Sequence, residues 1–226
     1  MSVKSSIGKS VAPHVTGLAP GLTDSFVREA LKRAVSGVGP LPGAAAAAEA
    51  LLSAHHGDVA KATKEIIDKH VRYAGAQGFV TNLGGLVTAV VAIPTNVTGL
   101  ALIQCRMIAA IAHLRGYDLD DPRVRNAILI SMLGSEGVDR LVKKKKLPAP
   151  PMAVATAPAH DPDLDVVISA EVASELVTRI AGKRLATVVG RRVPVVGGLF
   201  GLSADAYVTW RVGRYAAGEL LPRARR

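Results

Sequence analysis

Hydrophobic residues recur every three or four positions along most of the chain, and this spacing places them on one face of a helix. The first run covers residues 26–35 and ends before Gly37, the second covers 44–57, and the third covers 59–70 behind Asp58. Aspartate favours the position before a helix and glycine the position after it. We therefore expect three helices in this part of the chain.

Residues 73–105 contain no charged side chain and are rich in glycine. The stretch is long enough to cross a bilayer, but Asn, Thr, Gln and Pro residues dilute its hydrophobicity. Pro94 interrupts the helical hydrogen-bond ladder, so we expect two helices here, near 81–92 and 95–114. Each is too short for an ordinary membrane span but suits a buried or re-entrant hairpin.

A second glycine-rich apolar segment runs from Val193 to Leu202, after Arg191-Arg192. Glycines allow helix backbones to approach closely, and they lie here in apolar sequence with no phosphate-loop pattern around them. We therefore expect two glycine-rich apolar helical hairpins, with helix contacts at Gly78, Gly84, Gly85, Gly197, Gly198 and Gly201.

Between these two segments, the sequence predicts two further helices separated by a linker. Asp121-Pro122 predicts the start of a helix, because a capping side chain precedes a proline at the first helical position. Residues 147–160 hold four prolines among alanines, which predicts an extended or disordered linker. Apolar spacing over 166–180 predicts another helix, for which Asp163 or Asp165 is the expected cap.

Composition favours packed helices over strands. Apolar residues make up 49% of the 226 positions and aromatic residues only 4%, so small aliphatic side chains must fill the interior. We expect an all-α, compact multi-helix domain. Its parts are a flexible N-terminal segment (1–20), a first helical block (21–146), the linker (147–160) and a second helical block with a basic tail (161–226).

Cysteine content and the N-terminal sequence indicate a compartment. Cys105 is the only cysteine, so no disulfide can form within the chain. The first ten residues lack an apolar core of signal-peptide length. We expect a cytoplasmic protein in a reducing environment.

Basic residues outnumber acidic ones by 28 to 18, and this excess is spread along the chain, with local clusters at 143–146, at Arg191-Arg192 and in the C-terminal tail. Such clusters attract acidic lipid head groups, although a basic run is also a common solvated surface. Nucleic acid is not an expected partner, because the chain has few aromatic residues and no groove-reading motif. The residues expected to contact anionic lipid are Lys143, Lys144, Lys145, Lys146, Arg223, Arg225 and Arg226.

Three patterns resemble catalytic or ligand-binding motifs. Gly8-Lys9-Ser10 resembles the end of a phosphate-binding loop, but Val3 stands at the position of its first glycine. The alternating aspartates at 161–165 lack the glycine and glutamate of a calcium loop. Asp118, Asp120 and Asp121 are candidates for a carboxylate site, whereas helix capping at Pro122 also accounts for an aspartate there. We expect no catalytic residue, no metal and no cofactor.

Several segments together resemble the EcsC protein family. They are 78–86, 104–109, 116–122 and 193–198 with Asp205-Ala206, and their order along the chain makes the resemblance specific. It implies a bacterial protein of unassigned biochemical role, from a family named after a gene set that also encodes ABC-transporter components. The family-motif residues of this chain are Pro94, Arg106, Gly116, Tyr117, Asp118, Pro194 and Asp205.

These observations favour one function and leave two alternatives. The favoured function is a non-enzymatic accessory protein at the inner face of the plasma membrane, where it contacts anionic lipid or a membrane transporter. Tyr207, Trp210 and Tyr215 lie beside arginines, a mixture that favours a bilayer interface. The first alternative is a soluble helical protein that encloses a lipid or other apolar ligand. The second is a hydrolase that uses the Asp118, Asp120 and Asp121 carboxylates. Whether residues 79–105 enter lipid stays open, and homo-oligomerisation is compatible with each of these functions.

Overall fold

The computed structural model describes residues 24–38, 41–83, 93–189 and 197–223, and within them it describes the side-chain surroundings of 25–37, 42–76, 99–178 and 204–223. Helices dominate the described part of the chain, so the prediction of a compact all-α domain is confirmed. The elements in order are α2 (Asp24–Ser36), β1 (Gly37–Val38), β2 (Leu41–Pro42), α3 (Ala44–Ala54), α4 (Val59–Leu83), α5 (Ile93–Leu114), α6 (Pro122–Ser131), α7 (Gly134–Lys143), α8 (Pro151–Ala155), α9 (Pro162–Val189) and α10 (Gly197–Glu219).

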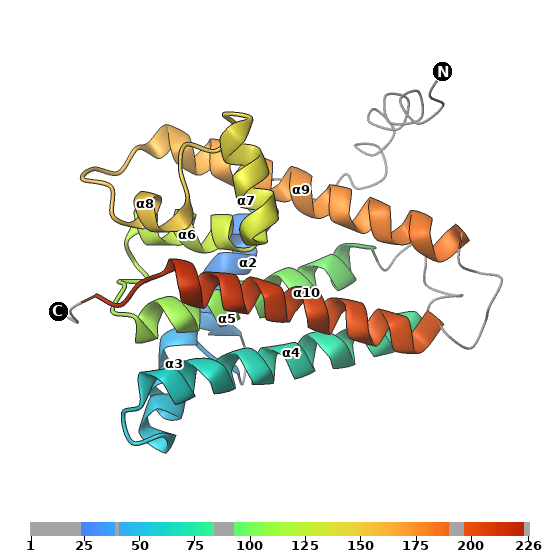
Figure 1. Cartoon of the computed structure of the whole chain (residues 1–226), viewed down its shortest axis with the longest axis horizontal. Coiled ribbons are helices and arrows are strands. Elements are labelled where there is room, and N and C mark those ends of the chain that lie inside the picture. The colour runs from blue at the N-terminus through green and yellow to red at the C-terminus, as the bar shows by residue number, and fades with distance from the viewer. Residues whose placement is uncertain (1–23, 39–40, 84–92, 190–196, 224–226) are drawn as a thin grey trace.

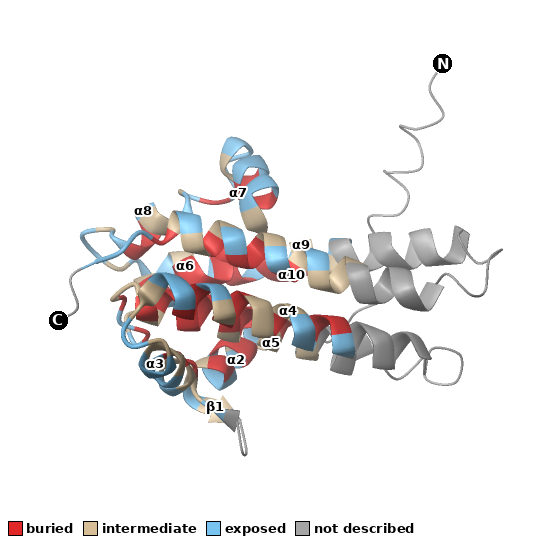
Figure 2. Cartoon of the chain, turned by 60° about the horizontal axis from the view of Figure 1, so that its bottom comes forward, coloured by how far each residue is buried: buried red, intermediate tan, exposed pale blue. Residues whose placement is uncertain are grey.

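Four long helices, α4, α5, α9 and α10, run along the long axis of the molecule, and the shorter helices gather at one end (Figure 1). In the part whose contacts are described, α10 packs mainly against α4 and α5. Every side chain from Met107 to Ala112 of α5 is buried, so this helix forms the centre of the core. The buried positions line the interior between the helices (Figure 2).

Local sequence signals explain how several helices begin and end. The carboxylate of Asp121 accepts a hydrogen bond from the Arg123 backbone amide, and Pro122 occupies the first turn of α6. Asp58 caps α4 in the same way through the Lys61 amide. Gly57 follows α3 with a φ of 86°, a conformation that few residues other than glycine adopt. These predicted boundaries are confirmed.

The apolar region near Pro94 is divided differently from the prediction. The predicted third helix continues as one helix, α4, as far as Leu83, so no separate helix begins near residue 81. Glycines within α4 cost helix stability, but packing against α10 and α5 offsets that cost. Pro94 lies in the first turn of α5, where its missing amide leaves no hydrogen bond unmade. The predicted helix at 95–114 is confirmed in α5.

The segment 147–160 is packed against the domain, and the expectation of an extended or disordered linker is wrong. Pro150 is extended and Pro151 begins the short helix α8, so these prolines stand where they fit a helix start. Leu147, Pro151 and Val154 are buried, and α8 packs on α6. The proline content predicted the absence of a long helix but not the burial of a short one.

The cap of α9 also differs from the expectation. The Asp163 backbone amide donates to the carboxylate of Asp161 at 3.0 Å, so the capping side chain is Asp161 rather than Asp163 or Asp165. Most of the predicted helix at 81–92 and the start of the second glycine-rich segment lie outside the described residues, in 84–92 and 190–196. Among the helices of the described part, none is both long enough and apolar enough to cross a membrane.

Candidate functional site

The first candidate site is the basic end of α7, a helix that projects from the bundle (Figure 2). Lys143 to Lys146 are all exposed. Lys145 has a φ of 56°, and the Lys146 amide donates to the carbonyl of Leu141 at 2.9 Å, so a compact turn ends the helix. Leu147 is buried directly after this turn. The lysine run is therefore anchored at a fixed place on the surface.

Three of the carboxylates near α7 form ion pairs with Arg140, Lys146 or Arg211. Glu171 pairs with Lys146 at 3.2 Å and Glu175 with Arg140 at 2.6 Å, both from α9. Glu136 pairs with Arg211 of α10 at 2.5 Å. Burial raises the pKa of the Tyr215 phenol of α10, and the charges of Glu219 and of Asp139 on α7 act in the same direction.

Lys143, Lys144 and Lys145 consequently remain without an ion pair among the described residues, and we call these three the basic tip. The sequence around the lysine run offers only Glu136 and Asp139 as nearby partners. Glu171 and Glu175 could not be recognised there, because they come from a helix that is distant in sequence. Since Lys146 is paired, the excess charge belongs to the three lysines before it.

The C-terminal arginines are placed differently from the basic tip. The Arg223 amide donates to the carbonyl of Arg115 at 2.8 Å, and its guanidinium lies 5.5 Å from the centre of the Tyr117 ring. Arg223 is exposed but fixed on the fold, and Arg225 and Arg226 lie outside the described residues. The predicted lipid contact at this end stays a prediction.

The second candidate site is an open hollow of about 510 Å³ beside the loop that precedes α6. Asp121 holds the Arg123 guanidinium through both carboxylate oxygens, and Arg123 also donates to the carbonyl of Ala157 at 2.5 Å. Asp120 pairs with Arg125 at 2.8 Å, and Asp118 accepts from the Asp120 amide at 2.9 Å. The three predicted carboxylates thus lie together, each with a partner close by in sequence.

The contacts with Arg123 determine the acidity of Asp121 in this hollow. The Arg123 side chain and backbone amide hold the pKa of the Asp121 carboxyl below its usual value, against the opposing effect of burial. A general acid at neutral pH needs a raised pKa instead. Within the described residues no group of three metal-binding side chains comes together. The arrangement serves to fasten the loop to the segment before α9.

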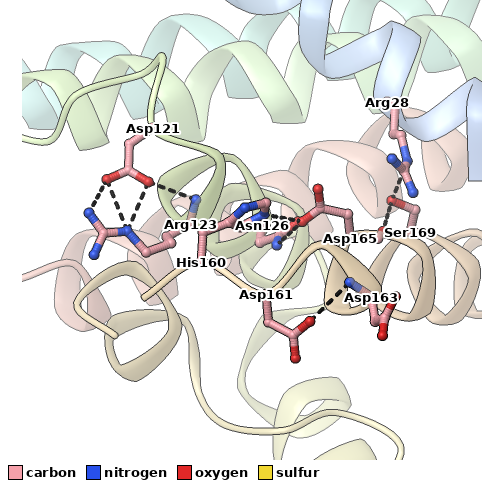
Figure 3. Close-up of polar contacts among 9 residues, drawn as sticks. All are labelled: Arg28, Asp121, Arg123, Asn126, His160, Asp161, Asp163, Asp165 and Ser169. Atoms are coloured by element: carbon pink, nitrogen blue, oxygen red, sulfur yellow. Dashed lines mark hydrogen bonds and ion pairs between the residues drawn. The ribbon is translucent and has the colours of Figure 1, made fainter. Parts of the chain in front are cut away.

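A polar network that the sequence did not predict lies beside this hollow (Figure 3). Asp165 of α9 accepts from the buried Asn126 amide of α6 at 2.7 Å, and His160 contacts the same oxygen at 2.9 Å. One turn later, Ser169 accepts a hydrogen bond from Arg28 of α2 at 3.0 Å. The network joins three helices, and a second, smaller hollow of about 130 Å³ adjoins it.

A second feature that the sequence did not predict is a set of buried polar side chains in the bundle core. Gln104 of α5 donates to Thr209 of α10 at 3.3 Å, and both are buried. His70 of α4 is buried too, with Nδ1 bonded to the Ile66 carbonyl and Nε2 without a hydrogen-bond partner among the described residues. Burial lowers the pKa of His70 to about 4. The imidazole is therefore neutral at physiological pH.

The predicted family-motif residues have several structural roles. Gly116 takes a φ of 83° at the turn after α5, and Tyr117 is buried beside it. Arg106 is half-buried on α5, and burial lowers its pKa. Asp118 is exposed in the loop before α6. Pro94 and Asp205 lie in α5 and α10, and Pro194 lies outside the described residues.

The predicted contact glycines are only partly placed. Gly78 lies in α4, and Gly197, Gly198 and Gly201 lie in α10, but their surroundings are outside the described residues, as are Gly84 and Gly85 themselves. A close glycine contact occurs at a position the prediction did not include. A Cβ atom at Gly213 would lie 3.0 Å from Ile67 Cγ1 and from Met107 Sδ.

Comparison with known proteins identifies a family. The EcsC protein family model matches residues 7–223, which is nearly the whole chain. No curated protein and no solved structure matches the chain. Because the family match includes every helix described above, we conclude that the chain belongs to the EcsC protein family.

Proposed function

We propose that this protein is a membrane-associated accessory protein that binds acidic phospholipid head groups through the basic tip of α7. We further propose that it lies at the inner face of the plasma membrane, because the leaflet that faces the cytoplasm contains acidic lipid. The observation that carries the proposal is the charge balance around α7. Three exposed lysines stand at the end of a projecting helix while Glu136, Glu171 and Glu175 pair with other cations.

The physical basis is the attraction between uncompensated lysines and an acidic bilayer. Each basic residue near such a surface contributes about 1 kcal/mol, so the three lysines together contribute about 3 kcal/mol to the binding free energy. No carboxylate of the described residues forms an ion pair with these three lysines, so within that part of the chain no ion pair has to break before they bind a phosphate. Because the turn that ends with Leu147 fixes the backbone of the run, the three lysines are presented from one place on the surface.

The test is co-sedimentation with vesicles of phosphatidylcholine alone and of phosphatidylcholine mixed with phosphatidylglycerol. The variant K143Q/K144Q/K145Q removes the basic tip. At about 1 kcal/mol per lysine, its affinity for the acidic vesicles falls roughly 100-fold. Binding of the wild type also weakens as salt rises, because the field of exposed charges is screened over about 8 Å at physiological ionic strength.

A matched control shows whether the loss of binding depends on the basic tip or only on the net charge of the protein. The variant K32Q/K61Q/K64Q removes three exposed lysines from α2 and α4 and changes the net charge by the same amount. We expect it to bind acidic vesicles like the wild type. Equal binding to neutral and acidic vesicles would contradict the proposal, and so would equal losses in the two triple variants.

A further inference from the structure

Two hollows meet at the side chains of Arg123 and His160, which line both of them. They lie where the segment before α9 approaches the start of α6 (Figure 3). Each hollow also has polar residues of its own, namely Asp118, Asp120 and Asp121 in the larger, open one and Asn126 and Asp161 in the smaller one. The two hollows are therefore neighbouring parts of one polar surface.

The smaller hollow is lined by a buried polar side chain with an unused acceptor. Asn126 is only 6% exposed, and its side-chain nitrogen donates to Asp165 at 2.7 Å. Its side-chain oxygen has no hydrogen-bond partner among the described residues. Because the backbone of Asn126 lies inside α6, the side chain is the part that lines the hollow. The amide oxygen therefore offers an acceptor to a ligand there.

His160 supplies a second acceptor beside it. The Nε2 atom of His160 contacts Asp165 at 2.9 Å, and since a carboxylate only accepts, Nε2 carries the proton. In the neutral ring Nδ1 is then an acceptor, and no donor reaches it among the described residues. Asp165 thus fixes both the amide and the imidazole, and each keeps an acceptor for a ligand.

The charge of the two hollows is negative, although the protein as a whole is basic. The carboxylates that hold Arg123 and Arg125 are compensated by these guanidinium groups. Asp118 and Asp161 accept hydrogen bonds from backbone amides instead and form no ion pair among the described residues. One uncompensated carboxylate therefore lines each hollow, and it attracts a cation.

The rest of the smaller hollow is mainly aliphatic. Its wall includes Pro148, Val154 and Leu164, and its volume is about 130 Å³. A cavity that takes a benzene ring has roughly 150 Å³, so a short methylene chain suits this hollow better than an aromatic ring. The hollow thus combines an apolar wall with acceptors and a negative charge.

We propose that the two hollows bind a linear aliphatic diamine, with its methylene chain against the apolar wall and one ammonium group in each hollow. An ammonium group only donates, and it therefore matches the Asn126 oxygen, His160 Nδ1 and the Asp161 carboxylate. A lysine side chain has the same chemistry but a single charge, whereas uncompensated carboxylates line both hollows. The inference concerns a site of its own and does not depend on the lipid contact of the basic tip.

Calorimetric titration with linear diaminobutane tests the proposal. The NMR signals of the Asn126 side-chain amide and of the His160 ring show where the ligand binds. Methylammonium supplies the charge without the chain, linear butanediol supplies the chain without the charge, and Nα-acetyl-lysine amide represents the lysine side chain of a protein partner.

Two double variants separate the site from the net charge. D118N/D161N removes the uncompensated carboxylates and keeps the acceptor oxygens that bind the backbone amides, so the loop and the cap of α9 stay intact. The matched control D68N/D139N removes two carboxylates from α4 and α7 instead. Circular dichroism and thermal melting confirm that both are folded.

We expect diaminobutane to bind the wild type and the control alike and to shift the Asn126 and His160 signals. D118N/D161N should bind it roughly tenfold or more weakly, because the ammonium groups lose their charged acceptors. The three other probes should bind the wild type more weakly than diaminobutane does.

Several results would overturn the inference. Equal losses in the two double variants would show that the diamine responds only to net charge, and equal affinity for methylammonium would show that the apolar wall takes no part. Tighter binding of the lysine derivative would assign the site to a protein partner. Absence of binding at millimolar diaminobutane, or binding that leaves the Asn126 signal unchanged, would exclude the site. Each of these results leaves the lipid contact of the basic tip untouched.

Discussion

Tyr117 donates a hydrogen bond to the backbone carbonyl of Leu221 at 3.0 Å and so ties the end of the chain to the turn after α5. The Arg223 amide strengthens this connection through the Arg115 carbonyl, and Leu220 is fully buried beside it. Tyr117, a residue of the family motif, thus has a structural role, because it holds the segment after α10 against the domain.

Replacing Tyr117 with Phe tests this role. The ring stays buried while the hydroxyl is lost, so the free energy of unfolding should fall by about 1 kcal/mol, the net value of one hydrogen bond. Chemical denaturation measures the change. The matched control is Tyr73→Phe, since Tyr73 is 55% exposed and should tolerate the same change without loss. Equal effects in the two variants would contradict a closing role for Tyr117.

The packed state of α8 leads to a second prediction. Val154 is buried and its neighbour Ala153 is exposed, so an aspartate introduced at position 154 would be buried and one introduced at position 153 would face solvent. Val154→Asp should lower the free energy of unfolding by at least about 2 kcal/mol, because it removes apolar burial and buries a charge. Ala153→Asp should change it by less than about 0.5 kcal/mol. Thermal melts that are identical for the two variants would show that α8 does not pack.

Features that depend on neighbouring residues could be predicted from the sequence. The cap at Asp121, the proline in the first turn of α6 and the glycine after α3 each involve residues within a few positions of one another. The helical spacing of apolar residues likewise predicts the fold class, because one buried face per helix is a local pattern. The all-α domain and most helix starts could therefore be predicted without the structure.

Contacts between distant helices could not be predicted in this way. Lys146 and Glu171 are 25 positions apart, Asn126 and Asp165 are 39 apart, and Tyr117 and Leu221 are 104 apart. No local pattern specifies which helices lie side by side, so a single sequence does not reveal these pairs. For the same reason the charge cluster at 143–146 was predicted, whereas the pairing of Lys146 that confines the excess charge to the basic tip was not.

The Asn126–Asp165 contact predicts a charge-dependent effect. Asn126→Asp places a second carboxylate against that of Asp165, where the amide nitrogen now lies 2.7 Å from the acceptor oxygen. Two carboxylates in contact at a partly buried site repel each other, and the repulsion ends when one takes up a proton. The variant should therefore be destabilised at pH 7 and regain stability as the pH falls towards 4. Urea denaturation at several pH values measures this recovery.

The swapped variant N126D/D165N provides the control for that experiment. It keeps one carboxylate and one amide in the site and restores a donor opposite an acceptor. We expect its stability at pH 7 to lie close to that of the wild type. If the swap is as unstable as Asn126→Asp alone, the loss comes from packing rather than from charge.

Two glycines of α10 should respond in opposite directions to substitution. A side chain at Gly213 would meet Ile67 and Met107 at 3.0 Å, so Gly213→Leu overpacks the contact with α4 and α5 and should cost about 1 to 3 kcal/mol. A Cβ atom at Gly218 would have no neighbour within 4 Å, so Gly218→Ala should stabilise the protein by roughly 0.5 to 1 kcal/mol through helix propensity. Melting temperatures that move in the same direction for both would contradict the role of Gly213 as a helix contact.

His70 makes the stability of the domain depend on pH. Its pKa is lowered from 6.5 to about 4 by burial, with Arg106 and Lys69 acting in the same direction and the Ile66 carbonyl opposing them. Between these two values the unfolded chain binds the proton and the folded chain does not. The free energy of unfolding therefore rises with pH in this window. The contribution is complete above about pH 6.5 and is lost as the pH falls towards 4, and it amounts to about 3 kcal/mol.

His70→Gln removes this titration while it keeps a side chain that can donate to the Ile66 carbonyl. We expect the slope of unfolding free energy against pH between 4 and 6.5 to be smaller in the variant than in the wild type. The control is His56→Asn, because His56 is exposed and has a φ of 53°, which asparagine tolerates. The control should keep the wild-type slope. If the slope persists unchanged in His70→Gln, the acid sensitivity of the domain arises from other groups, and the neutral buried imidazole is not its source.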